Sequence, residues 1–426
     1  MKGYLKKLPK EVQDLILLAG DIASINNMRA YLVGGCVRDL LLKVENLDLD
    51  IVIEGNGIKF AEELAGAFNT KPIRHRRFGT ATVDLLSHRL KIDIATARKE
   101  FYPEPAHLPV VENGSLKDDL KRRDFTINAM AININRDGFG KLLDLFGGEE
   151  DLNNRKIRVL HDLSFIDDPT RILRGIRFEQ RYNFRFEPKT KKLLKGAVAL
   201  RMLERVEPQR IRDDLILLLK ENYPLKEIRR LKELVGFAFI SPGLSVSDKI
   251  FRLIKFAEKQ INWFKKNYPD RRMLDTWAIY FMALMDPLNS NAVRKVCRKF
   301  VFRKGEDKRI LGYKKIGRKF ISNLKRIKNK PPDIFSILEP LSYEVILLVK
   351  AKYKYRGIQK TIEDFLEIYN GMKICSKGDD LRRLGLTPGP SYQEIFTKVL
   401  NAKLNGAVKT KEEELELIKK LIRKWS

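Results

Sequence analysis

The spacing of apolar residues changes once along this 426-residue chain, and the change predicts two kinds of folded structure. Before about residue 150 the apolar residues alternate, as in strands with one buried face. After Asp168 they recur every three or four residues, as along one side of a helix. The sequence therefore predicts an α+β head that is followed by an all-α part.

Proline and glycine breaks divide the helical part further, and no fixed-period repeat connects its segments. We expect an elongated chain of parts, because each segment carries its own helical pattern. The expected parts are a head (1–150), a neck (151–235), a basic body (236–345) and a tail (346–426).

The net charge of +29 belongs entirely to the helical part. Residues 1–150 contain 22 Lys/Arg and 22 Asp/Glu, whereas the densest basic stretch, 291–330, contains 16 Lys/Arg and two acids. Phe300, Phe302, Tyr313 and Phe320 are interleaved with these basic residues. A basic surface favours a polyanion such as RNA. The alternative is a solvated helix face in a Lys-rich protein.

Neither a membrane span nor a disulfide framework is expected. The longest purely apolar run, Trp277–Met285, has nine residues, whereas a spanning helix needs about 20. The three cysteines lie far apart and lack zinc-ligand spacing, which is typical of a protein of the reducing cytoplasm.

Gly34 and Gly35 follow a predicted strand and open an apolar helical run. Backbone N–H groups at such a turn can approach phosphate oxygens, and the helix N-terminus favours negative charge. Arg38 could pair with a phosphate. The alternative is an ordinary tight turn.

Three aspartates are predicted to lie on strands around this turn. Asp48 and Asp50 are two residues apart, so their carboxylates share one strand face, opposite Leu47, Leu49, Ile51 and Ile53. Asp93 likewise lies opposite apolar neighbours. Paired carboxylates that hold Mg²⁺ suit two-metal phosphoryl or nucleotidyl transfer. The alternative is a solvated strand edge.

These motifs together resemble a known family. YLVGGCVRDLLL followed by NLDLDIVIEG resembles the signature of class II tRNA nucleotidyltransferases, the bacterial-type CCA-adding enzymes, and of their poly(A) polymerase relatives, within the polymerase-β-like superfamily. Further stretches resemble the family's motifs in the same order: KIDIATARKE, KRRDFTINAMAI, LLDLFGGEEDLNNRKIRVL, IDDPTRILRGIRFEQR, LERVEPQRIRDDL and the tail TPGPSYQEIFTKVLNAKLNGAVKTKEEEL.

The resemblance implies roles for specific residues. Asp48 and Asp50 would hold two Mg²⁺ ions, and Asp93 would be the third catalytic acid. The other residues expected to meet the nucleotide are Gly34, Gly35, Arg38, Arg122, Arg123, Asp124, Asn128, Asp168, Arg171, Arg174 and Arg177, with Glu204 and Arg205 orienting Arg171.

Asp168 and Arg171 are expected to select the base. Cytosine and adenine each present an amino donor beside a ring-nitrogen acceptor, which a carboxylate beside a guanidinium complements. The alternative makes Asp168 the N-cap of a helix with Pro169 as its first residue, and both interpretations can hold together. Arg174 and Arg177 face either the nucleotide or solvent.

The predicted function is template-independent addition of C and/or A to the 3′ end of tRNA from CTP or ATP, with release of pyrophosphate. A poly(A) polymerase acting on other RNA 3′ ends is the nearest alternative. A non-catalytic RNA-binding protein and a small-molecule nucleotidyltransferase are disfavoured by the intact acids and by the basic helical part, respectively. The Pro-rich stretch 99–115 is expected to be a functional loop that matters for the switch to A. The start of the chain, LPKEVQDLILLAG, also resembles this module inside longer fused proteins, which leaves open that the chain is a fragment.

Overall fold

The computed structural model describes residues 3–44, 48–85, 90–326 and 330–423, without the side chains of Arg318 and Arg326. Leu47, which the sequence pattern assigns to the apolar strand face, lies outside the described residues. The chain forms two compact units, Met1–Phe239 and Ile240–Ser426. Among the described helices, none combines the length and the apolar character needed to cross a bilayer. The three cysteines are free thiols.

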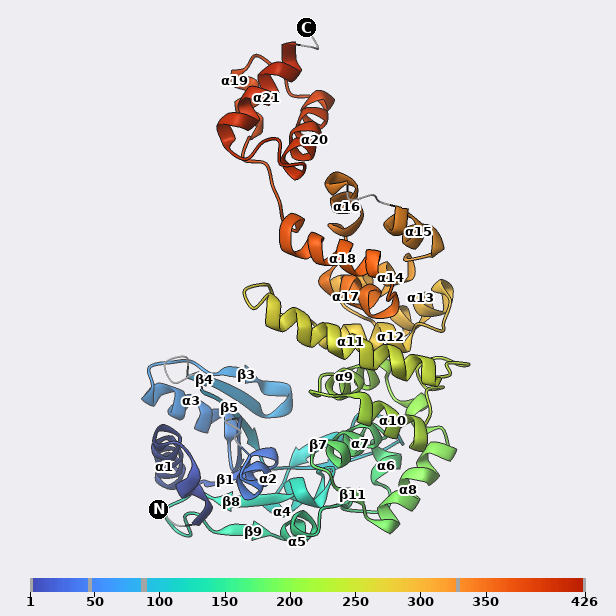
Figure 1. Cartoon of the computed structure of the whole chain (residues 1–426). Coiled ribbons are helices and arrows are strands. Elements are labelled where there is room, and N and C mark those ends of the chain that lie inside the picture. Colours follow the sequence, from blue (N-terminus) through green and yellow to red (C-terminus); the bar gives the residue numbers. More distant parts are fainter. Residues whose placement is uncertain (1–2, 45–47, 86–89, 327–329, 424–426) are drawn as a thin grey trace. The chain divides into compact units, whose positions relative to one another are not determined.

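A seven-stranded mixed sheet forms the core of the first unit (Figure 1). All neighbouring strands are antiparallel except β2 and β5, which are parallel. In spatial order the strands are β3 (Ile73–His75), β4 (Thr80–Leu85), β5 (Leu90–Thr96), β2 (Leu49–Glu54), β1 (Arg29–Val33), β8 (Met130–Asn133) and β9 (Leu142–Asp144).

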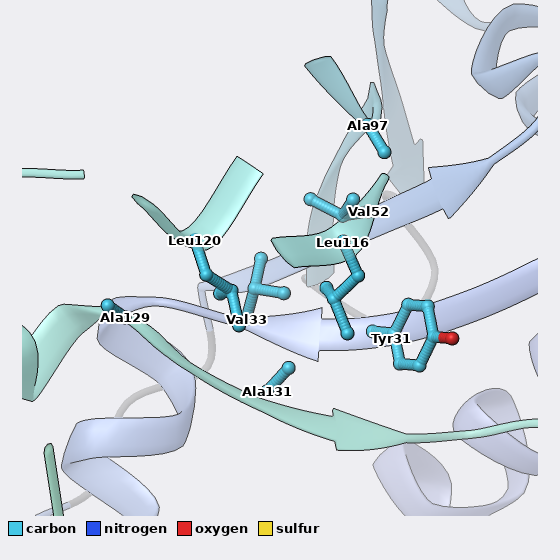
Figure 2. Close-up of a cluster of buried hydrophobic side chains, with 8 residues drawn as sticks. All are labelled: Tyr31, Val33, Val52, Ala97, Leu116, Leu120, Ala129 and Ala131. Carbon is cyan, nitrogen blue, oxygen red and sulfur yellow. The ribbon is translucent and has the colours of Figure 1, made fainter. Parts of the chain in front are cut away.

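The two faces of this sheet carry different residues because side chains alternate along each strand. Leu49, Ile51 and Ile53 are buried on one face, as the sequence pattern predicts. The other face carries Asp50 in line with Val52. There Val52 joins a buried cluster with Tyr31, Val33, Ala97, Leu116, Leu120, Ala129 and Ala131 (Figure 2).

Helices and short turns complete the first unit. The helix α4 brings Leu116 and Leu120 onto the cluster of Figure 2. The helices are α1 (Lys10–Ile25), α2 (Gly35–Leu42), α3 (Gly57–Ala67), α4 (Leu116–Lys121), α5 (Gly148–Asn153), α6 (Ser164–Asp167), α7 (Arg171–Arg181), α8 (Pro188–Ala199), α9 (Pro208–Leu219) and α10 (Leu225–Leu234), with 3₁₀ turns at Gly3–Lys7, Arg76–Phe78, Thr126–Asn128 and Met202–Arg205 and a small parallel pair, β10 (Lys156–Ile157) and β11 (Arg185–Phe186).

Two details differ from the sequence expectation. The stretch 99–115 is not one long loop, because β6 (Arg98–Phe101) and β7 (Val110–Asn113) pair as an antiparallel hairpin and leave 102–109 as the connection. Asp168 is not the N-cap of the following helix, since α7 begins at Arg171 and Thr170 is its N-cap. Asp168 instead ends α6 and accepts hydrogen bonds from Thr170 N and Oγ1, at 3.2 and 2.7 Å.

The described part of the second unit is helical, so the predicted change from an α+β head to an all-α part is confirmed. The apolar run Trp277–Met285 falls on α12, whose residues from Trp277 onward are all buried. The elements are α11 (Asp248–Asn267), α12 (Thr276–Leu284), α13 (Ser290–Lys299), α14 (Lys304–Lys314), α15 (Arg318–Arg326), α16 (Pro331–Leu338), α17 (Tyr343–Lys352), α18 (Arg356–Asp364), a π-helical turn (Phe365–Tyr369), α19 (Gly378–Arg383), α20 (Pro390–Leu404) and α21 (Lys411–Arg423).

Candidate active site

The sheet brings two of the three predicted carboxylates side by side. Asp50 on β2 lies directly opposite Asp93 on β5 in the parallel pair, where strands are about 4.8 Å apart. Asp48 immediately precedes β2 and is exposed. Asp93 accepts hydrogen bonds from Thr82 Oγ1 at 2.6 Å and from Lys91 Nζ at 3.0 Å. The three acids thus converge on the end of one strand pair.

The carboxyl of Asp50 lies in a position that favours a cation. Burial, together with the charges of Asp93 and Asp48, raises its pKa to about 6, although Arg123 opposes the shift. Among the described residues, no three His, Cys, Asp or Glu side chains are grouped closely enough to hold a metal by themselves. Mg²⁺ is usually held by one or two carboxylates and completed by substrate phosphates, so Asp48 and Asp50 are a suitable donor pair.

The glycine turn lies beside these carboxylates. Gly34 has φ +71°, which a residue with a side chain adopts at a cost. A Cβ at Gly34 would lie 2.6 Å from Arg123 Nη1 and 3.8 Å from Asp50 Oδ2. Gly35 then begins α2. The turn therefore needs glycine for both its backbone conformation and its close approach to the acid site.

Arg38 on α2 is buried and links the glycine turn to α7. Its Nε and Nη2 donate to Asp39 at 2.8 and 2.9 Å, and its Nη1 donates to Asn128 Oδ1 at 2.5 Å. The guanidinium carbon lies 5.2 Å from the ring centre of Phe178 and 4.7 Å from that of Tyr182. Phe178 lies on α7 and Tyr182 directly follows it, so the C-terminal end of α7 lies beside Arg38 and the glycine turn.

Asp124 connects a different part of the head to the same helix. It accepts hydrogen bonds from Arg174 Nε and Nη2 at 2.9 and 2.6 Å, and from Asn128 Nδ2 at 2.9 Å. Burial alone would raise its pKa, but Arg174 and Asn128 outweigh burial and lower the pKa to about 2. Asp124 is therefore an ionised acceptor that fixes Arg174.

The expected base-selecting pair is held by contacts that the sequence did not identify. Arg171 Nη1 donates to Ser164 Oγ at 2.6 Å and Nη2 to the carbonyl of Arg122 at 2.7 Å. Arg210 Nη2 donates to Asp168 Oδ1 at 2.7 Å, and Arg210 Nη1 to the carbonyl of Ala106 at 3.3 Å. In the described part of the chain, the hydrogen bonds from Thr170 and Arg210 to the Asp168 carboxylate end on Oδ1.

Within the predicted segment LERVEPQRIRDDL, the described contact to the base-selecting pair comes from Arg210, whereas Glu204 and Arg205 were expected to make it. Glu204 and Arg205 are exposed in a 3₁₀ turn, and Glu204 bonds Arg201 at 2.8 and 2.5 Å. Arg210 lies on the first turn of α9 and reaches Asp168 from there. Arg210 thus positions the carboxylate of Asp168, whereas the sequence predicted a contact that orients Arg171.

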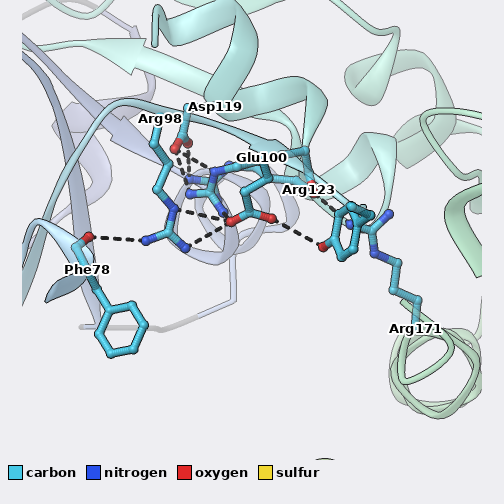
Figure 3. A network of polar contacts seen from close by, with 8 residues as sticks. Phe78, Arg98, Glu100, Asp119, Arg123 and Arg171 are labelled. Carbon is cyan, nitrogen blue, oxygen red and sulfur yellow. Dashed lines mark hydrogen bonds and ion pairs between the residues drawn. The ribbon is translucent and has the colours of Figure 1, made fainter. Parts of the chain in front are cut away.

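A network of charged groups joins the hairpin to α4 and to the arginines that follow it (Figure 3). Asp119 is fully buried and pairs with Arg122 at 2.6 Å and Arg123 at 2.9 Å. Glu100 on β6 accepts from Arg122 at 3.0 Å and from Arg98 at 3.0 and 3.2 Å. Arg122 and Arg123 are thereby held in place before any nucleotide binds.

Tyr102 at the end of β6 extends this network toward Arg171. Its hydroxyl donates to Glu100 Oε2 at 3.3 Å. Burial raises the pKa of Tyr102 to about 12, and the charge of Arg171 opposes that shift. The hairpin thus contributes Glu100, Tyr102 and Pro109 to the same cavity as Arg171, and its expected part in the switch to A stays a prediction.

These groups surround one cavity of about 670 Å³. Asp93 instead lines a neighbouring cavity of about 420 Å³, which Asp50 also lines. Predicted residues around the first cavity are Gly34, Gly35, Arg38, Asp48, Asp50, Arg122, Arg123, Asp124, Asn128, Asp168, Arg171, Arg174 and Arg177, and those that the sequence reasoning did not name as site residues are Cys36, Asp39, Arg98, Glu100, Tyr102, Pro109, Thr170, Phe178, Arg181 and Arg210.

The basic stretch 291–330 differs from a nucleic-acid surface with stacking aromatics. Phe300, Phe302 and Tyr313 are buried, and Phe302 stacks on Trp277 with ring centres 5.9 Å apart. These three aromatic residues thus belong to the core, whereas Phe320 is half-buried. Among the described side chains of this stretch, the exposed basic residues are Arg294, Lys295, Arg298, Lys299, Arg303, Lys304, Lys308, Lys315, Lys319, Lys325 and Lys330.

Comparison with known proteins places this site in a family. Residues 30–158 match the model of the poly A polymerase head domain. The chain is 36% identical to an A-adding tRNA nucleotidyltransferase of Geobacter sulfurreducens over 98% of its own length, but it spans 48% of the length of that relative. It is 33% identical to an A-adding tRNA nucleotidyltransferase of Halalkalibacterium halodurans over 94% of this chain and 91% of the relative.

Solved structures agree with this similarity. A CCA-adding enzyme in an apo form superposes with a TM-score of 0.77 and 37% identity, covering 96% of each chain. The Thermotoga maritima CCA-adding enzyme complexed with tRNA has a TM-score of 0.71 and 34% identity, covering 98% of this chain and 97% of that one. As the sequence motifs predicted, the chain belongs to the family of tRNA nucleotidyltransferases that share the poly A polymerase head domain.

Proposed function

We propose that the chain transfers nucleotides from ATP or CTP to the 3′ end of a tRNA and releases pyrophosphate. The observation that carries this proposal is the single cavity that joins the paired carboxylates, the glycine turn and the Asp168–Arg171 pair. A nucleoside triphosphate needs those three features in that combination: a metal-binding pair, a phosphate cradle and a base-reading pair. The tRNA and nucleotide complexes known for relatives support the same substrates.

In the proposed reaction the 3′-oxygen of the RNA attacks the α-phosphorus, and the bond from that phosphorus to the β-phosphate bridge breaks. Asp48 and Asp50 would hold Mg²⁺, which supplies charge neutralisation and a lower pKa for the attacking hydroxyl when it is bound. Asp93 pairs opposite Asp50 and lines the neighbouring cavity, from which it would support the metal site or assist deprotonation of the 3′-hydroxyl. Most of the rate enhancement then comes from holding the two reactants in line.

The phosphates are assigned to the groups around the glycine turn. The Gly34 N–H bonds to the carbonyl of Met130, so the phosphates are assigned to the N-terminus of α2 at Gly35, with Arg38 and Arg123 supplying positive charge beside it. Arg122, Asp124 and Asn128 hold the ribose and the adjoining phosphate. Because Asp119 already pairs with both Arg122 and Arg123, little conformational freedom remains to be lost on binding.

Base selection is assigned to Asp168 and Arg171. With Oδ1 of Asp168 occupied by Arg210 and Thr170, Oδ2 can accept the amino group of cytosine or adenine. A guanidinium has five N–H donors, so Arg171 can donate to the ring nitrogen while it keeps its bonds to Ser164 and Arg122. Uracil and guanine present the reverse order and would leave buried charges unpaired.

The tRNA is assigned to the basic helical part. Many Lys and Arg side chains of 291–330 are exposed while Phe300, Phe302 and Tyr313 are buried, which suits recognition through phosphates and helix shape rather than sequence. We also propose the division into head, neck, body and tail, which rests on the breaks between the helical segments of the sequence. The neck then contributes the base-reading helix.

One experiment tests the proposal and the number of nucleotides added. Transcripts of one tRNA that lack the last one, two or three nucleotides are incubated separately with labelled ATP, CTP or UTP. We expect AMP or CMP to be incorporated and UMP to be rejected, and the pattern among the three transcripts separates addition of A, of CC and of all of CCA. An Asp50→Asn variant should bind the tRNA without extending it.

Two results would refute the proposal. Failure of the wild-type chain to extend any transcript would remove the transferase assignment, and extension by the Asp50→Asn variant would remove the metal assignment. An unstructured RNA primer serves as a comparison, because processive AMP addition to it would identify a poly(A) polymerase instead.

A further inference from the structure

A second cavity lies against the C-terminal half of α7. It has a volume of about 460 Å³, and its lining residues come from α7, from the end of α9 and from the segment that leads into the start of α10, all within the first unit. Its lining residues are Arg177, Arg181, Leu217, Lys220, Glu221, Asn222, Tyr223, Lys226 and Glu227.

This cavity adjoins the nucleotide cavity at the phosphate end. Arg177 and Arg181 line both cavities. Arg181 lies ten residues beyond Arg171 on α7, which is about 15 Å along the helix axis. Arg38, beside the glycine turn, rests on the rings of Phe178 and Tyr182 next to these arginines. A nucleotide with its base at Arg171 and its phosphates at the glycine turn therefore points its terminal phosphates toward the second cavity.

The second cavity has more positive than negative groups. Arg177, Arg181, Lys220 and Lys226 face two acids, Glu221 and Glu227. The closest oppositely charged pairs there are long, at 3.7 Å from Arg181 to Glu221 and 3.9 Å from Lys226 to Glu227. Arg181 and Lys226 thus make no close ion pair with these two acids, although Lys226 Nζ donates to the carbonyl of Gln180 at 2.5 Å, and the wall retains positive charge for an incoming anion.

Arg177 itself is short of partners. Its Nε is buried and has no hydrogen-bond partner in the described part of the chain. Burial and the nearby charge of Arg174 lower the pKa of Arg177, which is the behaviour of a cation without enough compensating negative charge. Glu227 is also compatible with an anion beside it, because burial raises the pKa of its carboxyl to about 7 and the protonated form is uncharged.

We propose that this second cavity receives the pyrophosphate that leaves the nucleotide, as an exit subsite beyond the glycine turn. The inference rests on the proposed function, in which the broken phosphorus–oxygen bond leaves its electron pair on pyrophosphate. The ligand chemistry is that of a phosphate anion, so a backbone phosphate of the RNA is the other possible source. Continuity with the phosphate end of the nucleotide cavity favours the leaving group.

The test compares two double variants of the full chain. Lys220→Gln with Lys226→Gln removes the two cations that line the second cavity but not the nucleotide cavity, and Lys192→Gln with Lys195→Gln removes two exposed cations of α8 as the control. Binding of labelled inorganic pyrophosphate is measured by equilibrium dialysis, and pyrophosphate inhibition of AMP or CMP incorporation is measured in parallel. The first variant should weaken pyrophosphate binding about tenfold, as expected for two partly exposed charges, and the control should change it less than twofold.

The outcomes separate the two sources and the two proposals. Unchanged pyrophosphate binding in the first variant, or an equal loss in the control, overturns the exit subsite. A raised KM for tRNA with unchanged pyrophosphate affinity assigns the cavity to an RNA phosphate instead. Pyrophosphate binding that depends on these lysines in a chain that extends no tRNA would support the subsite and refute the proposed function.

Discussion

The contact between Arg210 and Asp168 makes a specific prediction for the variant Arg210→Ala. This substitution removes a charged hydrogen bond of 2.7 Å between two side chains that are 21% and 17% exposed. A hydrogen bond to a charged group at such a site contributes about 1.5–3 kcal/mol. If that contribution holds Asp168 in the productive orientation, kcat/KM for ATP should fall about 10- to 150-fold.

Discrimination between nucleotides should also decline in this variant. Arg210 and Thr170 both direct Oδ1 of Asp168, so the loss of Arg210 leaves only Thr170 to hold the carboxylate and weakens the match to an amino donor. We therefore expect the ratio of kcat/KM for ATP to that for UTP to fall, measured with a tRNA that accepts AMP. Arg210→Lys should recover part of the loss, because an ammonium cannot donate as a fork to both Asp168 and the Ala106 carbonyl.

Glu204→Ala is the matched control, since the family resemblance assigned the bracing role to Glu204 and the structure pairs it with Arg201 at the surface. It should change kcat/KM less than about twofold, as is usual for an exposed ion pair. A neutral Arg210→Ala combined with a damaging Glu204→Ala would refute the structural assignment. Thermal unfolding of each variant distinguishes a specific loss of discrimination from general destabilisation.

Three further predictions concern the glycine turn, the ion pair of the buried Glu344 with Arg272, and the carboxyl of Asp214. Gly34→Ala should lower kcat/KM and displace Arg123, because Gly34 has a positive φ and a Cβ there would lie 2.6 Å from Arg123 Nη1. Gly66→Ala on α3 is the control and should leave activity unchanged, because a Cβ at Gly66 meets nothing within 4 Å. Equal effects of the two substitutions would contradict this prediction. Glu344→Gln should cost about 1.5–3 kcal/mol in urea unfolding followed by tryptophan fluorescence, because it removes the charge of a fully buried carboxylate that accepts two hydrogen bonds from Arg272, whose side chain is 46% exposed. The exposed Glu394→Gln, which pairs with Lys398, should cost less than about 1 kcal/mol, and similar costs would argue against the reasoning. Burial raises the pKa of Asp214 to about 6, so the charged carboxylate opposes folding above that pH. Asp214→Asn should therefore raise the Tm at pH 8 but not at pH 4. An equal gain in Tm at both pH values would disprove the connection between this pKa and stability.

Local sequence patterns were sufficient for much of the head. Alternation on β2 predicted that Asp50 lies opposite Leu49, Ile51 and Ile53, because a strand has a period of two whatever it pairs with. The glycine turn was also predictable, since a strand, two glycines and an apolar helical run occupy consecutive positions. The hairpin of β6 and β7 was missed because its Pro-rich connection obscured two short strands.

Contacts between distant segments could not be predicted in the same way. Asp50 and Asp93 are 43 residues apart and meet only through the parallel pairing of β2 with β5. Arg210 reaches Asp168 because of the phase of α9 against the turn before α7, and one residue of error in a helix rotates a side chain by about 100°.

The sequence by itself determined the order of elements, the division between an α+β head and helices, and the types of residue available for metal, phosphate and base. The tertiary structure decided which of those residues share a cavity, and it turned Phe300, Phe302 and Tyr313 inward from the basic stretch. The physical reason is that periodicity depends on neighbours along the chain, whereas a site depends on the packing of segments that are far apart in it.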